Sequence, residues 1–276
     1  MPTLLAMKLT GRLKLMLVTG ASGFLGQHLV HAAVAGRWQV IAPPSNQLDV
    51  CHAAAVMDEV RAWKPTAIVH LAYRRHDPRA IVMASANVAA AAAATGARLV
   101  HVSTDVVFGG RSWAYTEDDR PTPVTDYGRW KAGAEDEVLA ACPGAVVVRP
   151  SLIYGTDELA PVQLDVRAAV TGRSAMSFFT DEWRCPVHAG DFAQALSQLA
   201  SMRDLAGPLH VTGPEAIDRG ALARLIARWM GHDPAAVRTT TIAESGQTRP
   251  GRVVLDVTAA AELGIRCRSV SDVLAV

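Results

Sequence analysis

Two residues four positions apart, Tyr127 and Lys131, could act as an acid–base pair. On a helix, side chains at this spacing lie on one face, one turn apart. A free tyrosine has a pKa of about 10, so it is a poor proton donor at neutral pH unless a nearby cation lowers that value. The spacing therefore predicts that Lys131 lowers the pKa of Tyr127 and makes it a catalytic acid. The alternative interpretation is a surface pair on an amphipathic helix.

Three glycines at three-residue spacing, Gly20, Gly23 and Gly26, follow a short apolar run and precede an apolar helix start. This order is typical of a dinucleotide site. The first glycine permits a sharp turn, the second lets the backbone approach a pyrophosphate, and the third lets the helix pack closely on the strand. The helix N-terminus then faces negative charge. Together with Tyr127 and Lys131, this turn predicts a nicotinamide-dependent enzyme.

An apolar run over 98–102 ends in two hydroxyl residues, Ser103 and Thr104. Ligands bind at the carboxyl ends of strands in a doubly wound sheet. One of the two hydroxyls can therefore hydrogen-bond a substrate carbonyl, while the other bonds nearby backbone.

The elements that must position these residues alternate along the chain. We expect strands near 15–19, 38–42, 67–71, 98–103 and 145–149, and helices near 24–35, 51–62, 79–95 and 127–141. This alternation predicts an α/β fold, a Rossmann-type doubly wound parallel sheet with helices on both faces. A further strand is expected at Leu209–Val211. The predicted NAD(P)-binding domain covers 1–150 plus about 187–212, and a small C-terminal substrate-binding lobe covers about 151–186 and 213–276.

Several segments resemble the extended short-chain dehydrogenase/reductases, and within that superfamily the dTDP-4-dehydrorhamnose reductase group. The matching segments are VTGASGFLG (18–26), LDV (48–50), HLAY (70–73), SANV (85–88), HVSTDVVFGG (101–110), DYGRWKAGAE (126–135), RPSLIYG (149–155) and RPGRVVLD (249–256). They span nearly the whole chain in family order. The resemblance implies an NAD(P)H-dependent reductase of a keto group on a nucleotide-linked deoxysugar.

The resemblance also implies roles for individual residues. Thr104 matches the catalytic hydroxyl, Tyr127 the proton donor, and Lys131 the residue that holds the nicotinamide ribose. Asp49 and Val50 match an adenine contact. The full cofactor-binding set that it implies is Gly20, Ser22, Gly23, Phe24, Leu25, Gly26, Asp49, Val50, Leu71, Ala72, Tyr73, Asn87, Ser103, Tyr127, Lys131, Pro150 and Ile153.

The residue after Asp105 separates reaction types. Family members that remove water from a sugar nucleotide resemble Thr-Asp-Glu here, whereas this chain has Val106. A dehydratase would lack its second acid, so a simple ketone reduction is favoured, with Asp105 and Val106 facing the substrate. An NAD(P)-dependent epimerase and a reductase of a non-sugar ketone stay open. An alternative of another class is a non-catalytic NADP-binding regulatory subunit that resembles the methionine adenosyltransferase beta subunit, which has no chemical need for Thr104, Tyr127 and Lys131.

The predicted lobe carries aromatic and basic residues close together. Trp183 and Arg184 could stack on a nucleobase and pair with a diphosphate, and Arg249 beside a Pro-Gly turn could also meet phosphate. The structural alternative places Phe178 and Phe179 in the core and Arg184 in an ion pair.

Cofactor preference depends on the end of the second strand. A carboxylate there would bond the ribose 2′-hydroxyl of NAD, and an arginine would suit the 2′-phosphate of NADP. The chain has Ala42–Asn46, which contains neither. Because no carboxylate repels a phosphate, NADP(H) is favoured over NAD(H).

Composition limits the remaining partners. The chain has 276 residues and a formal net charge of +1, which gives no reason to expect nucleic acid or a membrane. The expected partner is a small-molecule substrate, with a homodimer left open. The cysteines show no pairing or metal-ligand spacing, so they predict free thiols in the reducing cytoplasm and no metal site. They are Cys51, Cys142, Cys185 and Cys267. Residues 1–13 are expected to be a short extension, with Met7 as an alternative initiator.

Overall fold

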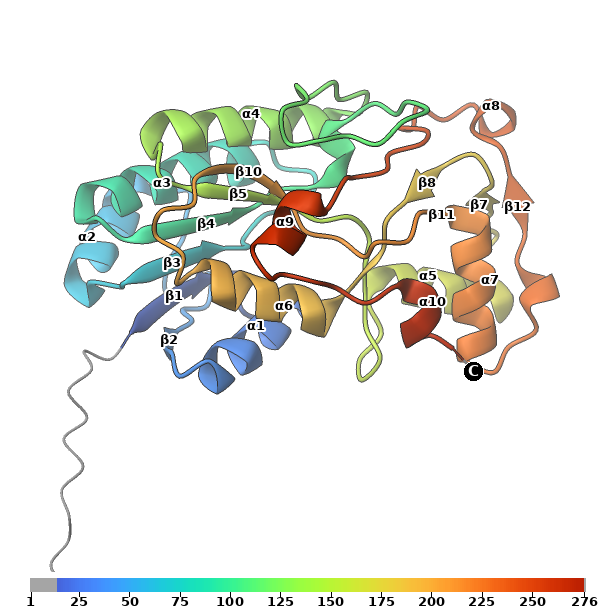
Figure 1. The fold of residues 1–276 in the computed structure, drawn as a ribbon, viewed down its shortest axis with the longest axis horizontal. Coiled ribbons are helices and arrows are strands. Elements are labelled where there is room, and N and C mark those ends of the chain that lie inside the picture. Colours follow the sequence, from blue (N-terminus) through green and yellow to red (C-terminus); the bar gives the residue numbers. More distant parts are fainter. Residues whose placement is uncertain (1–13, 276) are drawn as a thin grey trace, which may run out of the picture.

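The computed structural model describes residues 14–275, so the predicted extension over 1–13 lies outside the described residues. A six-stranded sheet in the order β10-β5-β4-β3-β1-β2 forms its centre, and all its neighbouring strands are parallel (Figure 1). The strands are β1 (Leu15–Thr19), β2 (Gln39–Ile41), β3 (Ala67–His70), β4 (Arg98–Val102), β5 (Val146–Arg149) and β10 (Gly207–His210). The predicted Rossmann-type class is confirmed, and β10 is the further strand expected near Leu209–Val211.

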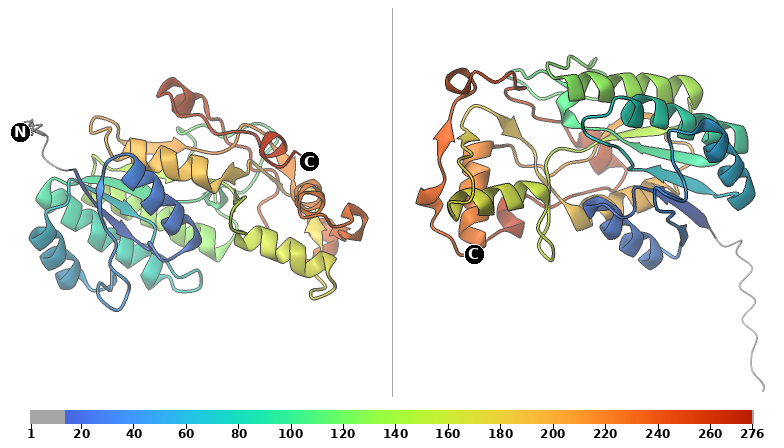
Figure 2. Two further views of the ribbon diagram at one scale, coloured as in Figure 1. Left: turned by 90° about the horizontal axis from the view of Figure 1, so that it is seen from below. Right: turned by 180° about the vertical axis from the view of Figure 1, so that it is seen from behind.

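Helices cover both faces of this sheet (Figures 1 and 2). Successive side chains of a strand point to opposite faces. Met16 and Val18 of β1 accordingly pack toward α1 and α6, while Leu17 packs toward the other three helices. Because both faces are buried, the strands are nearly continuous apolar runs. The helices are α1 (Phe24–Ala35) and α6 (Ala189–Leu199) on one face, and α2 (Ala53–Trp63), α3 (Ala84–Thr95) and α4 (Asp126–Ala141) on the other.

The predicted helix over 79–95 begins instead with a π-helical segment, η1 (Arg79–Met83), which continues into α3. Asp77 caps it, because its carboxylate accepts hydrogen bonds from the backbone N–H groups of Arg79 and Ala80. The loop from β3 to η1 is thereby fixed at the edge of the sheet where the strands end.

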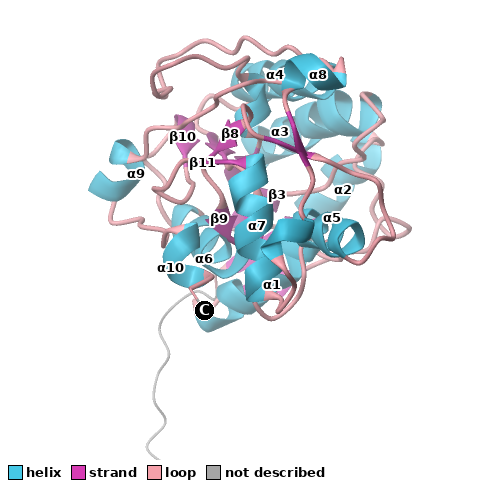
Figure 3. Cartoon of the chain, turned by 90° about the vertical axis from the view of Figure 1, so that its right-hand side faces the viewer, coloured by secondary structure: helices cyan, strands magenta, loops and turns pink. Residues whose placement is uncertain are grey.

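A smaller lobe lies beside the carboxyl ends of the strands, and Figure 3 looks onto it. In the core of the lobe, Val166, Phe178 and Ile226 pack with Val270 and Leu274 near the C-terminus. Its elements are α5 (Pro161–Val170), β7 (Phe178–Phe179), β8 (Trp183–Arg184), β11 (Ile217–Asp218), α7 (Arg219–Trp229), η3 (Pro234–Ala236), β12 (Thr239–Thr240), α8 (Ile242–Ser245) and α10 (Val270–Val273).

The lobe is connected to the sheet domain by a strand pair and by a returning helix. β6 (Ile153–Tyr154) pairs with β9 (Val187–His188), and α9 (Thr258–Glu262) returns to the sheet, where Ala260 and Ile265 join the core around β1. The lobe boundaries expected from the sequence stay a prediction, but part of 213–276 packs on the nucleotide domain. Within 14–275, no helix is long and apolar enough to cross a membrane. The four cysteines are free.

Candidate active site

The glycine turn between β1 and α1 has the geometry that its sequence predicts. Gly20 has φ of 74°, and a Cβ there would lie 2.8 Å from the backbone nitrogen of Ala72. A Cβ on Gly26 would lie 2.4 Å from the Gly20 carbonyl oxygen. Gly23 is the N-cap of α1 and offers no side chain to the helix, so the first N–H groups stay accessible to an anion. These contacts explain why positions 20 and 26 require glycine.

A cleft of about 1240 Å³ opens at the carboxyl ends of the strands and extends under the lobe. The cleft lies at the topological switch point between β1 and β3, where the strand order reverses. Ligands bind at this point in doubly wound sheets. The cleft brings together most of the predicted residues, namely Gly20, Gly23, Phe24, Leu25, Gly26, Leu71, Tyr73, Ser103, Thr104, Asp105, Val106, Tyr127, Lys131, Pro150, Ile153, Arg184 and Arg249.

Tyr127 and Lys131 both come from the first turns of α4, which begins after the Thr125 cap. The Lys131 ammonium is buried and donates to the Val102 carbonyl at 2.7 Å. Burial lowers the pKa of Lys131 to about 8, although Glu135 opposes that shift. The two predicted partners therefore share a helix and a cleft, as their spacing indicates.

The predicted effect of Lys131 on the Tyr127 pKa stays a prediction, because other groups around the phenol dominate its pKa. Burial raises that pKa well above its ordinary value, and the neighbouring Tyr73 raises it further. The cation that opposes this rise is Arg75, whose guanidinium carbon lies 5.5 Å from the centre of the Tyr127 ring. Sequence spacing indicated that Tyr127 and Lys131 lie together, but not that Arg75 lies beside the Tyr127 ring.

The two hydroxyls after β4 have different surroundings. Ser103 donates to Glu135, which forms a buried ion pair with Arg149 at 2.7 Å. Thr104 donates to the Asp105 carboxylate at 3.3 Å and accepts from the Val106 N–H. Ser103 is thus held by a buried network behind the cleft, while Thr104 is tied only to its neighbours at the cleft surface.

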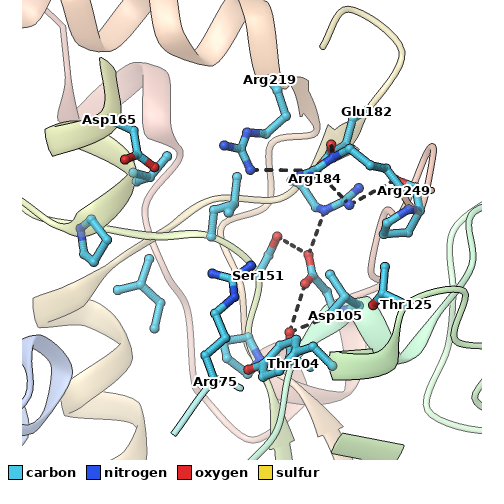
Figure 4. Close-up of a pocket in the computed structure, with 18 of the residues that line it drawn as sticks. Arg75, Thr104, Asp105, Thr125, Ser151, Asp165, Glu182, Arg184, Arg219 and Arg249 are labelled. Carbon is cyan, nitrogen blue, oxygen red and sulfur yellow. Dashed lines mark hydrogen bonds and ion pairs between the residues drawn. The ribbon is translucent and has the colours of Figure 1, made fainter. Parts of the chain in front are cut away.

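Asp105 connects this loop to the lobe (Figure 4). Its carboxylate accepts from Ser151 at 2.6 Å and lies 3.5 Å from the Arg184 guanidinium. Burial raises the Asp105 pKa, and Arg184, Ser151 and Thr104 oppose that rise. The carboxylate is therefore a fixed bridge between the loop after β4 and the lobe.

Arg184 matches the structural alternative, an ion pair. Its Nη1 donates to the carbonyls of Trp183 and Gly251, and its Nη2 donates to Pro250 and pairs with Glu182 at 3.0 Å. With Asp105 near Nε, each guanidinium nitrogen has protein partners, so pairing with a diphosphate would require breaking them. Phe178 and Phe179 are 2% and 7% exposed and therefore belong to the core, as that alternative expects.

Glu182 is the centre of a charge cluster that the sequence did not indicate. It is 1% exposed and contacts Arg184, Arg249 and Arg219, the last at 3.7 Å. Burial would raise the Glu182 pKa, but the three guanidinium groups outweigh it and hold the pKa below its usual value. With Asp105 beside Arg184, two carboxylates are thus matched against three cations at the lobe side of the cleft.

Some predicted residues do not line this cleft. Asp49 is exposed and caps the Cys51 N–H, while Asn87 donates to the Val50 carbonyl at 3.1 Å. Their cofactor contacts stay predictions, as do the cofactor contacts of Ser22, Val50 and Ala72, which also lie outside the lining. The predicted substrate contact of Trp183, outside the lining as well, stays a prediction too. Among residues 14–275, no group of three His, Cys, Asp or Glu side chains could hold a metal ion.

Besides Glu182, sequence reasoning missed other polar residues that line the cleft, among them Arg75, Ser151 and Arg219. Arg75 follows β3 by five positions, so the strand-end rule could have found it. Ser151 follows β5 and could have been found in the same way. Arg219 begins α7, far from any motif, and no sequence signal points to it.

Comparison with known proteins places this geometry in a family. The model of the RmlD substrate binding domain matches residues 14–275. The beta subunit of methionine adenosyltransferase 2 from Rattus norvegicus is 31% identical over 92% of this chain and 84% of its own length. The dTDP-4-dehydrorhamnose reductase of Mycolicibacterium smegmatis is 34% identical over 81% of this chain and 71% of its own length.

A solved structure shows the same fold. The crystal structure of dTDP-4-dehydrorhamnose reductase from Bacillus anthracis, in complex with NADP, has a TM-score of 0.86 at 24% identity. The match covers 95% of this chain and 98% of that one. The family match and the shared fold agree with the resemblance seen in the motifs. This chain belongs to the RmlD substrate binding domain family, within the extended short-chain dehydrogenase/reductases.

Proposed function

We propose that this chain is an NADPH-dependent oxidoreductase that reduces the keto group of a nucleotide-linked deoxysugar such as dTDP-4-dehydrorhamnose. The observation that carries the proposal is the convergence of Thr104, Tyr127 and Lys131 on the cleft that the glycine turn also enters. Reducing a ketone needs a hydride and a proton delivered to one carbonyl. The relatives named as reductases support the same reaction.

The nucleotide side of the cleft fits a dinucleotide. A Cβ on Gly23 would meet only the Gly20 oxygen, at 3.4 Å, so this face of the turn can accept a pyrophosphate against the α1 N-terminus. Lys131 would hold the nicotinamide ribose. When bound, the reduced nicotinamide supplies the hydride. NADP(H) is favoured over NAD(H) because Ala42–Asn46, after β2, contains no carboxylate to repel the 2′-phosphate.

Two side chains complete the reduction. Tyr127 gives its hydroxyl proton to the carbonyl oxygen as that oxygen gains negative charge. Thr104 donates a second hydrogen bond to the same oxygen, for which its hydroxyl must turn from Asp105, 3.3 Å away. Asp105 stays in place because Ser151 and Arg184 hold it.

The lobe side fits the anionic part of such a substrate. Arg219 and Arg249 share Glu182 with Arg184, so the three positive charges exceed the two negative charges of Glu182 and Asp105. The Arg249 side chain is 29% exposed, whereas that of Arg184 is 2% exposed. We assign contact with the diphosphate to Arg249 and Arg219 rather than to Arg184.

The test is oxidation of NADPH and of NADH with dTDP-4-dehydrorhamnose, comparing wild type with Tyr127→Phe. Loss of the proton donor should lower kcat by about 10²- to 10⁴-fold while NADPH binding is retained. Tyr154→Phe is a matched control, because the buried Tyr154 hydroxyl has no hydrogen-bond partner among the described residues. Equal turnover by wild type and Tyr127→Phe would refute the assigned mechanism, and no turnover by wild type would refute this substrate class.

A second candidate function is a non-catalytic regulatory subunit. It is favoured by one observation, the 31% identity to the beta subunit of methionine adenosyltransferase 2 across 92% of this chain. That role has no chemical need for Thr104, Tyr127 and Lys131, which are all present here. Binding of NADPH without keto-sugar turnover, together with a change in the activity of an added methionine adenosyltransferase, would support it instead.

The cytoplasm is the proposed location, because the four cysteines are free and thiols persist in a reducing compartment. Fractionation of cells that express the protein tests this. Light scattering of the purified protein tests the homodimer that the sequence leaves open.

A further inference from the structure

Helix α4 lies against the loop that carries Thr104 along three successive turns. A Cβ on Gly128 would lie 2.3 Å from the Val106 carbonyl oxygen, so the two backbones are in close contact there. One turn further, the Lys131 ammonium donates to the Val102 carbonyl at 2.7 Å. Positions at this spacing share one face of a helix. The same face of α4 therefore contacts the loop both before and after Thr104.

Glu135 makes the third contact, one turn beyond Lys131. Its carboxylate accepts a hydrogen bond from the Ser103 hydroxyl, and both side chains are buried. A hydrogen bond to a carboxylate is about twice as strong as one between neutral groups, and little water competes for it in a buried place. Because Ser103 immediately precedes Thr104, this bond fixes the backbone from which the Thr104 side chain extends.

Arg149 on β5 holds the Glu135 carboxylate in one orientation. Its Nη2 donates to Oε2 of Glu135 at 2.7 Å, and its Nε lies 3.1 Å from Oε1 and 3.2 Å from Oε2. The guanidinium is held in turn by two rings. Its carbon lies 5.1 Å from the centre of the Phe108 ring, and its Nη1 lies 3.4 Å from Nε2 of His210. The acceptor of the Ser103 hydroxyl is therefore itself fixed.

Thr104 has no such anchor of its own. In the described chain, its hydroxyl has hydrogen bonds only with Asp105 and with the Val106 N–H, both within the same loop. The backbone N–H groups of residues 103 and 105 tie the loop to β5 and its continuation, but not to α4. The bond from Ser103 to Glu135 is thus the side-chain link to α4 that lies next to Thr104 in the chain.

We propose that Ser103 is a positioning residue that sets the separation between the Thr104 and Tyr127 hydroxyls. It does so through Glu135, which lies on the same helix as Tyr127. This inference rests on the proposed function, in which both hydroxyls reach one carbonyl oxygen. Their separation decides whether that oxygen receives two hydrogen bonds or one. In such geometry, a misplacement of about 1 Å costs roughly 10²-fold in rate. The two adjacent hydroxyl residues therefore have different roles, since Thr104 contacts the substrate and Ser103 holds Thr104 in place.

The first experiment is a double-mutant cycle on kcat for the keto sugar, with Ser103→Ala and Thr104→Val alone and combined. Ser103→Ala leaves the pair of Glu135 and Arg149 intact, so the protein should fold. It should lower kcat by about 10- to 100-fold and leave KM within about twofold of wild type. In the Thr104→Val protein the same substitution should change kcat by less than about twofold, because the hydroxyl that it misplaces is already absent.

Ser197→Ala is the matched control, because Ser197 is also a buried serine but lies on α6, outside the cleft lining. Its kcat should equal that of wild type. Equal losses from Ser103→Ala with and without Thr104 would overturn the proposal, since Ser103 would then not act through the Thr104 hydroxyl. Unchanged kcat in Ser103→Ala would also overturn it. If NADPH binding alone became weaker, Ser103 would instead be a direct cofactor contact.

The second experiment needs no sugar substrate. Backbone hydrogen exchange is followed by mass spectrometry in wild type and Ser103→Ala, on peptides that cover 103–110 and, for comparison, β1. Loss of a bond to a carboxylate should speed exchange in the 103–110 peptide by roughly tenfold and leave the β1 peptide unchanged. Identical exchange in the two proteins would overturn the inference. Faster exchange in this peptide without turnover of any keto sugar by wild type would support the inference about the loop and refute the proposed substrate class.

Discussion

The two sides of the cleft are built on different physical principles. The nucleotide side depends on close backbone fit at Gly20 and Gly26, where an added Cβ would meet backbone atoms at 2.8 and 2.4 Å. The lobe side depends on buried charges that balance one another around Glu182. A backbone fit is lost when atoms are added, whereas a charge cluster fails when one partner is removed. Single substitutions can therefore disable one side and leave the other intact.

The largest effect on stability is expected at the lobe side. Glu182→Gln leaves three arginines without their shared carboxylate, and removing one partner of a buried ion pair costs about 3–5 kcal/mol. Urea unfolding should show this loss. NADPH affinity should stay within roughly twofold of wild type, because the nucleotide side shares no partner with Glu182. Arg129→Gln, which removes an exposed pair with Asp126, should cost less than about 1 kcal/mol. Equal losses in both variants would contradict the comparison.

A smaller effect is expected from Gly26→Ala on the nucleotide side. The new Cβ would overlap the Gly20 carbonyl, so the turn must shift, at a cost of about 1–3 kcal/mol. Fluorescence titration should show weaker NADPH binding. Gly133→Ala on α4 is the control, because a Cβ there meets nothing within 4 Å. That variant should be about 0.5–1 kcal/mol more stable than wild type. Unchanged NADPH binding by Gly26→Ala would show that the turn is not a cofactor site.

The effect that is smallest at neutral pH is a dependence of stability on pH beneath the nucleotide side. Burial lowers the pKa of His70 to about 3, and its ring bonds Thr19 at 2.7 Å. Between about pH 3 and pH 6.5, His70 binds a proton in the unfolded chain but not in the folded chain. Stability should therefore fall as pH decreases below about 6.5, by up to about 1.4 kcal/mol per pH unit for this group.

His70→Asn should reduce that slope of stability against pH, measured by urea unfolding across the acid range. His31→Asn is the control, because His31 is exposed on α1, and its slope should match that of wild type. If His70→Asn keeps the full slope, then His70 does not remain neutral in the folded protein.

Local spacing explains what could be predicted. Gly20, Gly23 and Gly26 lie within seven positions, and Tyr127 and Lys131 within one helical turn, so short-range geometry fixes their relation. The strands of the sheet are continuous apolar runs because both faces are buried. The order and type of the elements from β1 to β5 followed from these patterns, with the π-helical start at Arg79 as a local exception.

The lobe side could not be predicted, because its members have no sequence relation to one another. Glu182, Arg219 and Arg249 come from separate segments, and only folding brings them together. The sequence also could not tell that Arg184 directs its donors to backbone carbonyls. Burial of such charges, and hence their pKa values, depends on the surrounding chain rather than on spacing.

The sequence by itself thus determined the sheet, the dinucleotide turn and the pair Tyr127 and Lys131, because each is encoded within a few residues. Tertiary structure alone decided which distant groups lie beside Tyr127. Arg75 and Tyr127 are 52 positions apart, and only the parallel order of β3 and β4, with α4 packed above them, places one beside the other. Charge acts through space, so its effect on a proton donor is set by the folded arrangement.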